Sequence, residues 1–174
     1  MDKIAGIVLA GGQSSRMGKN KALLAFQGVP MVEHMQKILK GAGIPDVYIS
    51  GTVAGYEAIP DDEPLSGPGR AMAHLLQKFS ERYERLLFIP VDMPFMSEEV
   101  LRRLAAEPGN VFIKDHPFPN CLLTRGEVLT AHSVKGVLEE ASARALEIAG
   151  GGKKDFLNLN TPEEWEKAVA PPGV

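Results

Sequence analysis

The segment LAGGQSSRMGKNK, residues 9–21, combines two adjacent glycines with two serines and three cationic side chains. It directly follows an apolar run, residues 4–9, that is typical of a short buried strand. A glycine-rich turn at a strand end presents backbone N–H groups, and Arg16, Lys19 and Lys21 add local positive charge. An arginine holds phosphate oxygens in a fork, whereas a lysine acts as a point charge. The segment therefore predicts a binding site for a phosphate-bearing small molecule.

The spacing within this loop excludes two familiar nucleotide-binding motifs. The interval from Gly12 to Gly18 is one residue too long for a P-loop, and Asn20 stands where a magnesium-binding serine or threonine is required. The dinucleotide pattern G-x-G-x-x-G is also absent. The alternative, that the cations are solvated surface charges, is weakened by their position at the end of an expected strand.

A second candidate residue follows the most apolar run of the chain. The stretch FIPVDMPFMS, residues 88–97, places Asp92 between two prolines, directly after residues 86–89, which are typical of a buried strand. Mg²⁺ at phosphate-transfer sites is held by one or two carboxylates together with substrate phosphates, so Asp92 is a candidate metal ligand. The alternative is that Asp92 caps the turn or the helix that follows.

The stretch NLNTPEE, residues 158–164, supplies two more polar side chains. The side-chain oxygens of Asn158 and Asn160 are suited to complete a metal shell or to orient a phosphate, and the alternative is a turn that bonds its own backbone. The acidic run that begins at Asp61 is by itself a solvated loop. Together the glycine loop, Asp92 and the two asparagines predict a magnesium-dependent site for a nucleoside triphosphate. Catalysis there would rest on positioning and on neutralising phosphate charge.

The elements that must position these residues alternate along the chain. Apolar runs typical of strands alternate with amphipathic stretches typical of helices, and glycines or prolines separate them. The expected strands cover residues 4–9, 47–50, 57–59, 86–89, 111–113, 121–123 and 156–157. The expected helices cover residues 30–40, 70–79, a stretch from 98, residues 134–149 and a stretch from 162 that opens with a capping box. This alternation predicts an α/β fold with a mostly parallel, doubly wound sheet.

The candidate residues all follow expected strands. Residues 11–21 follow the first strand, Asp61 follows the third, Asp92 follows the fourth and Asn158 follows the last. Ligands of doubly wound sheets bind beyond the carboxyl ends of the strands. We therefore expect these residues to line one site.

Length and composition restrict the class of protein. The 174 residues suit a single domain over residues 1–170, with residues 171–174 as a frayed tail. The net charge of −3 and the lack of a basic stripe argue against a nucleic-acid partner, and no apolar run has the roughly 18 residues of a membrane span. The single cysteine, Cys121, stands among apolar residues and reads as a core residue, which suits a cytoplasmic protein.

Five stretches occur in an order that resembles a known family. They are LAGGQSSRMGKNKALL, IPDDEP, GPGRA, FIPVDMPF and NLNTPEE, and they cover nearly the whole chain. The set is similar to that of the molybdenum cofactor guanylyltransferases, within the nucleotidyltransferase superfamily. The resemblance implies a Rossmann-like three-layer fold and transfer of GMP from GTP to the terminal phosphate of molybdopterin, with release of pyrophosphate. It also implies Mg²⁺ as cofactor and transient contacts with proteins that deliver molybdopterin and receive the product.

For the glycine loop, the resemblance implies direct contacts with the nucleotide. Arg16 and Lys21 would hold the triphosphate and the departing pyrophosphate. The guanine and the phosphates would meet backbone groups of Leu9, Ala10, Gly11 and Gly12.

For the later strand ends, the resemblance implies four further roles. Asp61 matches the acid that approaches the nucleoside, and Asp92 matches the Mg²⁺ ligand. Asn158 and Asn160 match a pair near the metal and the acceptor. The acceptor phosphate would attack the α-phosphorus in line, and it is already ionised, so no strong base is needed.

The chain departs from the family pattern at three places. Asn20 stands where many relatives have Asp, and GPGRA, residues 67–71, replaces the usual G-P-L-x-G. The family's His-Pro segment aligns with either His116-Pro117 or Phe118-Pro119. Two alternatives therefore stay open: a nucleotidyltransferase with another base or acceptor, such as cytidylyl transfer or a sugar or alditol phosphate acceptor, and a non-catalytic nucleotide-binding protein. The intact LAGG argues against the cytidylyl relatives, which usually show Leu-Ala-Ala-Gly.

Overall fold

The centre of the molecule is a six-stranded sheet with the order β4-β1-β5-β7-β6-β8. The computed structural model describes residues 3–11, 20–62, 66–149 and 152–169. β7 runs antiparallel to β5 and β6, whereas β1 is parallel to β4 and β5, and β6 is parallel to β8. The strands are β1 (Ile4–Leu9), β4 (Val47–Ser50), β5 (Arg85–Pro90), β6 (Val111–Ile113), β7 (His116–Leu123) and β8 (Arg144–Leu146). The expected mostly parallel sheet is confirmed.

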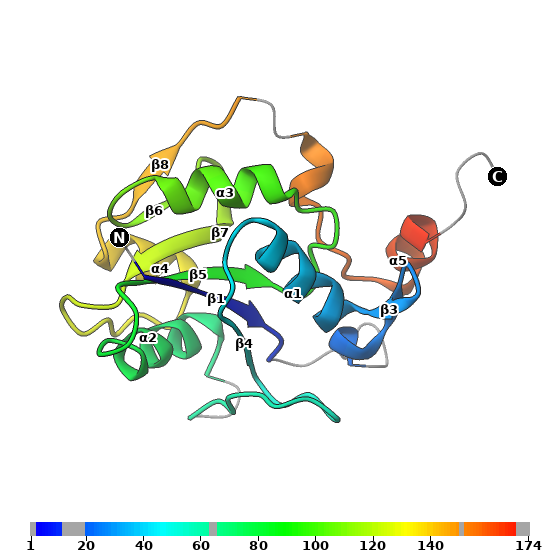
Figure 1. The fold of residues 1–174 in the computed structure, drawn as a ribbon, viewed down its shortest axis with the longest axis horizontal. Coiled ribbons are helices and arrows are strands. Elements are labelled where there is room, and N and C mark those ends of the chain that lie inside the picture. Colours follow the sequence, from blue (N-terminus) through cyan, green and yellow to red (C-terminus); the bar gives the residue numbers. More distant parts are fainter. Residues whose placement is uncertain (1–2, 12–19, 63–65, 150–151, 170–174) are drawn as a thin grey trace.

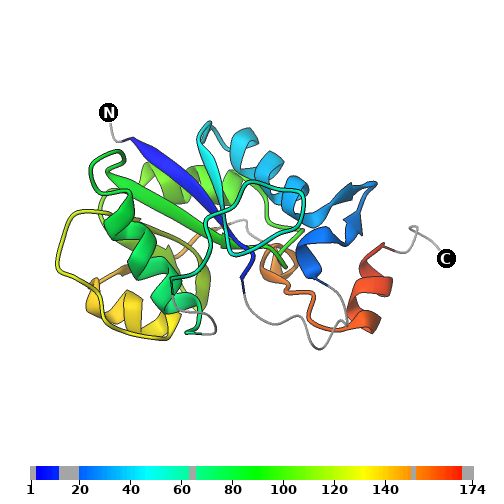
Figure 2. The ribbon, with the colours of Figure 1, turned by 90° about the horizontal axis from the view of Figure 1, so that it is seen from below.

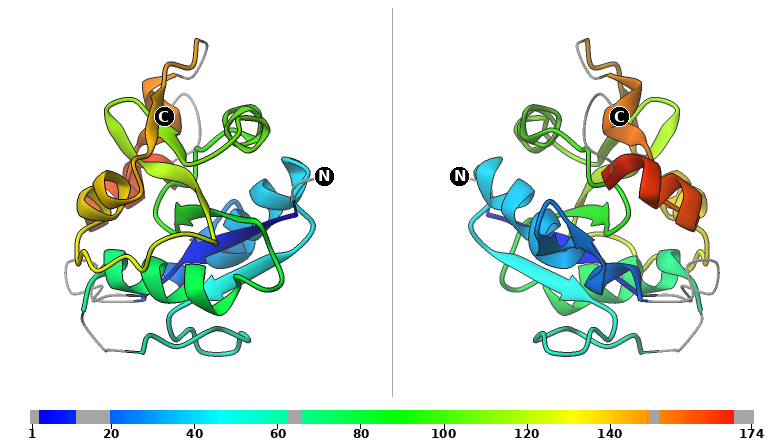
Figure 3. Two further views of the ribbon diagram at one scale, coloured as in Figure 1. Left: turned by 90° about the vertical axis from the view of Figure 1, so that its left-hand side faces the viewer. Right: turned by 90° about the vertical axis from the view of Figure 1, so that its right-hand side faces the viewer.

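Helices cover both faces of this sheet and make it the middle layer of three. On one face lie α1 (Met31–Gly41) and α3 (Glu98–Ala106), and on the other lie α2 (Pro68–Lys78) and α4 (Val134–Glu140) (Figures 1 and 3). Side chains of β5 alternate between the two layers: Leu87 and Ile89 pack with α1 and α3, whereas Leu86 and Phe88 pack with α2 and α4. The three-layer α/β architecture is therefore built on two apolar clusters, one on each face of the sheet.

Smaller elements gather beyond the carboxyl ends of β1 and β5. They are the 3₁₀ helix η1 (Lys21–Leu23), the hairpin of β2 (Ala25–Phe26) and β3 (Val29–Pro30), the 3₁₀ helix η2 (Lys153–Phe156) and α5 (Pro162–Val169) (Figure 2). The hairpin turns at Gln27 and Gly28, whose φ angles of 51° and 83° match a two-residue turn that suits twisted strands. The aromatic ring of Phe26 lies 6.0 Å from that of Trp165, so α5 packs on this hairpin.

Two predicted elements in the C-terminal third are wrong. The helix expected over 134–149 ends at Glu140, because Ser142 adopts a left-handed φ of 51° and the chain then enters β8 beside β6. The strand expected at 156–157 is instead the end of η2 and the residue after it. The strand expected at 57–59 contributes a single parallel bridge, from Ile59 to Ser50.

Two loops cross closely at the end of β1. Gly51, directly after β4, has a φ of +106°, and a Cβ placed on it would lie 2.5 Å from the backbone nitrogen of Gly11. Only glycine combines that dihedral with that approach. The crossing brings the chain after β4 against the first residues of the glycine loop. In the described part of the chain, no helix has the length and apolar character needed to cross a membrane.

Candidate active site

A cleft of about 310 Å³ opens at the carboxyl ends of β1, β4 and β5. Its walls come from residues 9–11, from Asn20 and Lys21, from the start of α2, from residues 90–92, and from Phe118 and Asn158. Of the predicted site residues that the structure describes, all but Asn160 line this cleft, and Asn160 bonds to one that does. A larger hollow of about 710 Å³, between α2 and the end of β7, contains none of them.

Four predicted residues form one hydrogen-bonded group. The Lys21 ammonium donates to Asp92 Oδ2 at 3.3 Å and to Asn160 Oδ1 at 3.1 Å. The amide of Asn158 donates to the other Asp92 oxygen at 3.1 Å. The side chains of Lys21 and Asp92 are only 19% and 15% exposed, so solvent screens their ion pair weakly. Residues from three distant parts of the sequence therefore meet at one point of the cleft.

The backbone holds each member of this group in place. Asn20 caps η1 by accepting a hydrogen bond from the N–H of Ala22 at 3.1 Å, which fixes the position of Lys21 as the first residue of η1. The Asp92 carbonyl accepts from the N–H of Leu159 at 2.9 Å. Leu159 is buried, and the side chains of Asn158 and Asn160 on either side of it are turned back to the cleft.

The residues after Asn160 form the predicted helix start. Thr161 Oγ1 accepts from the N–H of Glu164 at 3.2 Å, and Glu164 Oε2 accepts from the N–H groups of Asn160 at 2.7 Å and Thr161 at 3.1 Å. This reciprocal capping confirms the capping box expected from TPEE. It also fixes the backbone of Asn160, which contacts Lys21.

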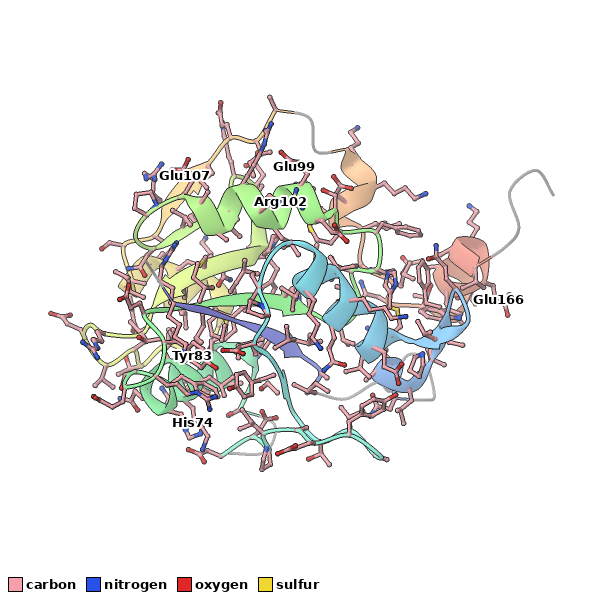
Figure 4. The ribbon with its side chains drawn as sticks, in the orientation of Figure 1. His74, Tyr83, Glu99, Arg102, Glu107 and Glu166 are labelled. Carbon is pink, nitrogen blue, oxygen red and sulfur yellow. The ribbon has the colours of Figure 1, made fainter. Side chains whose placement is uncertain are left out.

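Asp61 lies apart from this group, against the glycine loop. A Cβ placed on Gly11 would lie 2.9 Å from Asp61 Oδ2, so the absence of a side chain at position 11 lets the carboxylate approach. Partial burial raises the pKa of the Asp61 carboxyl, and the nearby His74 of α2 opposes that shift (Figure 4). His74 itself pairs with Asp62 at 2.6 Å. The cleft thus has a second acidic side chain, separated from the Lys21–Asp92 pair.

The remaining predicted residues have different outcomes. Leu9 and Ala10 line the cleft and are each 9% exposed. Gly12 and Arg16 lie outside the described residues, so their predicted roles in phosphate binding stay predictions. Cys121 is buried in the sheet, as expected.

The GPGRA segment has a structural explanation at one of its two unusual positions. Gly69 is buried in the first turn of α2, and a Cβ placed on it would collide with the backbone carbonyl of His132. A leucine is therefore excluded at position 69 while residues 132 and 133 lie against the helix. Ala71, by contrast, lines the cleft.

Sequence reasoning named Phe118 only in one alignment of the family's His-Pro segment and did not place it in the cleft, which it lines. The predicted strand at 121–123 is in fact the end of β7, which begins five residues earlier, at His116. Because β7 is antiparallel to β5, its start points toward the carboxyl end of β5, and Phe118 lines the cleft together with Asp92. Strand direction depends on pairing across the sheet, and the local apolar pattern carries no signal of it.

Comparisons with known proteins agree with this architecture. Residues 6–156 match the family described as MobA-like NTP transferase domain. Among similar proteins, a molybdenum cofactor guanylyltransferase of Xanthomonas euvesicatoria is 36% identical, with 94% of this chain and 93% of that protein covered. One of Rhodobacter capsulatus is 30% identical, with 95% of each covered.

A solved structure shares the fold. The crystal structure of molybdopterin-guanine dinucleotide biosynthesis protein A from Archaeoglobus fulgidus superimposes with a TM-score of 0.71 at 20% identity, covering 95% of this chain and 96% of that one. At that identity the likeness concerns the fold, whereas the sequence matches cover most of the chain. The chain therefore belongs to the MobA-like NTP transferase family.

Proposed function

We propose that the protein transfers GMP from GTP to the terminal phosphate of molybdopterin and releases pyrophosphate. Relatives at 36% and 30% identity over nearly the whole chain are named molybdenum cofactor guanylyltransferases. The observation that carries the proposal is the contact of Lys21 with both Asp92 and Asn160, because it joins a cation, a carboxylate and an amide inside the cleft. The proposal includes a cytoplasmic location and transient contacts with proteins that deliver molybdopterin or accept the product.

In this proposal the nucleotide lies across the end of β1. Backbone groups of Leu9, Ala10 and Gly11 contact the guanine and the phosphates, and Gly12 continues this contact along the loop. The carboxylate of Asp61, beside Gly11, approaches the nucleoside. Backbone groups in this position are already ordered by β1, so little further ordering is needed when the ligand binds.

The proposed reaction requires charge control more than acid–base chemistry. An oxygen of the acceptor phosphate attacks the α-phosphorus of GTP. The bond from that phosphorus to the oxygen bridging to the β-phosphate breaks, and pyrophosphate departs with the electron pair. Lys21, together with Arg16, holds the triphosphate and neutralises the charge that accumulates on the leaving pyrophosphate.

Mg²⁺ is part of the proposal, and the residues present fit this ion. Oxygens of Asp92 and Asn160 already converge on a cation, the Lys21 ammonium, and Asn158 lies at the second Asp92 oxygen. Carboxylate and amide oxygens are the hard ligands that Mg²⁺ prefers, and phosphates and water complete its shell. Asp92 would hold the ion, with the two asparagines beside it. When bound, the ion neutralises phosphate charge and orients the reacting groups.

Nucleotide preference gives the first test. Thermal unfolding is measured with GTP, CTP, ATP and UTP, each with and without Mg²⁺. A nucleotide at 100 times its Kd adds roughly 2.7 kcal/mol to the free energy of unfolding, which raises the melting temperature measurably. We expect a shift with GTP that Mg²⁺ enlarges. A larger shift with CTP or another nucleotide would contradict the proposed base, and no shift with any of them would contradict nucleotide transfer.

The variant Asp92→Asn tests the role of the carboxylate. It keeps the shape of the side chain and removes one negative charge, so the fold should persist while Mg²⁺-dependent pyrophosphate release falls roughly 100-fold or more. Glu166→Gln, on the exposed surface of α5, removes the same charge away from the cleft and serves as the matched control (Figure 4). Unchanged turnover in Asp92→Asn would rule out Asp92 as the metal ligand.

A further inference from the structure

The two halves of the cleft differ in chemistry. The half formed by β1, β4 and α2 presents backbone and small side chains, with Gly11 and Gly67 among them, and the carboxylate of Asp61. The half formed by the ends of β5 and β7 presents Asp92 and Phe118. Among the described residues that line the cleft, Phe118 is the only aromatic one. A flat apolar ring therefore lies on the side away from the proposed nucleotide contacts.

The sheet fixes the position of Phe118. The last paired residues of β5 and β7 are Phe88 and Asn120. Beyond this pair, Phe118 lines the cleft together with Pro90 and Asp92. Phe118 is half-buried and packs against both apolar clusters of the core. Its ring is thus anchored against the core while it also lines the cleft.

The aromatic rings near Phe118 are covered by other side chains of the protein, whereas no aromatic ring of the described residues covers Phe118. His116, two residues earlier in β7, stacks on Phe156 with ring centroids 4.0 Å apart and an interplanar angle of 9°. Phe95, three residues after Asp92, is covered by the ammonium of Lys154 at 4.4 Å. Within the described part of the chain, no aromatic ring stacks on Phe118. Its cleft-facing side is a surface for an aromatic ring from outside the protein.

We propose that Phe118 is the platform on which the flat heterocycle of the acceptor stacks, which makes it a specificity-determining residue for phosphorylated pterins. This inference rests on the proposed function. A pterin is a flat bicyclic heteroaromatic ring, and stacking on an aromatic side chain selects it over an acyclic phosphate. Lys153 and Lys154 add exposed positive charge to the segment whose Phe156 stacks on His116 at the start of β7, and such charge raises the local concentration of anionic ligands.

The test measures binding of a stable probe, 6-hydroxymethylpterin phosphate, from the change in pterin fluorescence. The variant Phe118→Leu should weaken binding of the probe about tenfold, whereas Phe118→Trp should retain it. The matched control is Phe112→Leu in β6, a half-buried phenylalanine outside the cleft. Glycerol phosphate, which has no ring, should bind with the same affinity to the unaltered protein and to all three variants. With molybdopterin as acceptor, Phe118→Leu should raise the KM for molybdopterin and leave the KM for GTP unchanged.

The outcomes separate this inference from the proposed function. The pterin titration is made without nucleotide, so its result does not depend on GTP binding. Probe affinity of Phe118→Leu within twofold of the unaltered protein would overturn the inference while leaving guanylyl transfer in place. An equal loss in Phe112→Leu would also overturn it, because the effect would then be one of packing.

Discussion

At the scale of single residues, Lys21 is the side chain whose partners matter most. Here its ammonium bonds to Asp92 and Asn160, yet the proposed reaction needs Lys21 on the triphosphate and Asp92 on a metal ion. In the proposed reaction, the ammonium and a divalent cation would therefore compete for one carboxylate. The triphosphate, by drawing Lys21 away, would couple nucleotide binding to metal binding.

This competition predicts opposite effects of one substitution. The variant Lys21→Met should bind Mn²⁺ several-fold more tightly in the absence of nucleotide, because the competing positive charge is gone. The same variant should bind GTP about tenfold more weakly. Mn²⁺ is titrated by electron paramagnetic resonance, with Lys167→Met on α5 as the control. Weaker Mn²⁺ binding in Lys21→Met would show that the lysine supports the metal site instead of competing for it.

Removing the negative charge of Asp61 should stabilise the folded protein and weaken GTP binding. Burial raises the pKa of its carboxyl in the folded protein, so the stability linked to this group is present in acid and is lost as pH rises through that pKa. Asp61→Asn should therefore melt at a higher temperature than the unaltered protein at neutral pH, and the difference should disappear in acid. GTP binding should weaken. Asp115→Asn, on an exposed turn, is the control for charge removal, and a lower melting temperature for Asp61→Asn at neutral pH would contradict this account.

At the scale of elements, the start of α2 is fitted to the loop before α4. The backbone of residues 132 and 133 occupies the space where a side chain at position 69 would stand. The departure from the family pattern at Gly69 is therefore explained by packing between two segments. Of the two unusual residues, Ala71 is the one that lines the cleft.

The packing at Gly69 is tested by unfolding in urea. Gly69→Ala should lower the free energy of unfolding by about 1–3 kcal/mol, because its methyl group meets backbone that cannot turn aside. Gly126→Ala, where a Cβ meets nothing within 4 Å, should change it by less than about 0.5 kcal/mol. Equal values for the two variants would show that the loop at 132 yields to α2.

Elements set by local pattern could be predicted from the sequence, and those set by distant pairing could not. β1, β5 and α1 follow from apolar runs and amphipathic spacing within one segment. The end of α4 at Glu140 could not be predicted, because the apolar spacing continues to Ala145, whereas the structure pairs residues 144–146 with β6 as the strand β8. The direction of β7 is likewise fixed by its neighbours in the sheet. The sequence therefore offered Phe118 only as one alignment of the His-Pro segment, and its place in the cleft could not be predicted.

At the scale of the whole molecule, a single aromatic cluster connects the segments that carry the site. Phe26 packs with Phe95 at a centroid distance of 5.5 Å and with Trp165 at 6.0 Å. These rings lie within five residues of Lys21, Asp92 and Asn160 respectively. The convergence of the site residues was predictable because ligands of doubly wound sheets bind at the carboxyl strand ends. The cluster that holds them together was not, since it depends on the packing of α5 against the β2–β3 hairpin.

The most direct test of the account identifies the product. The protein is incubated with molybdopterin, Mg²⁺ and an equimolar mixture of GTP and CTP. The products are separated and identified by their masses in mass spectrometry. We predict molybdopterin guanine dinucleotide with one pyrophosphate released for each molecule formed. Formation of the cytosine dinucleotide would contradict the proposed guanylyl transfer. So would the failure of a protein that binds GTP to form any dinucleotide.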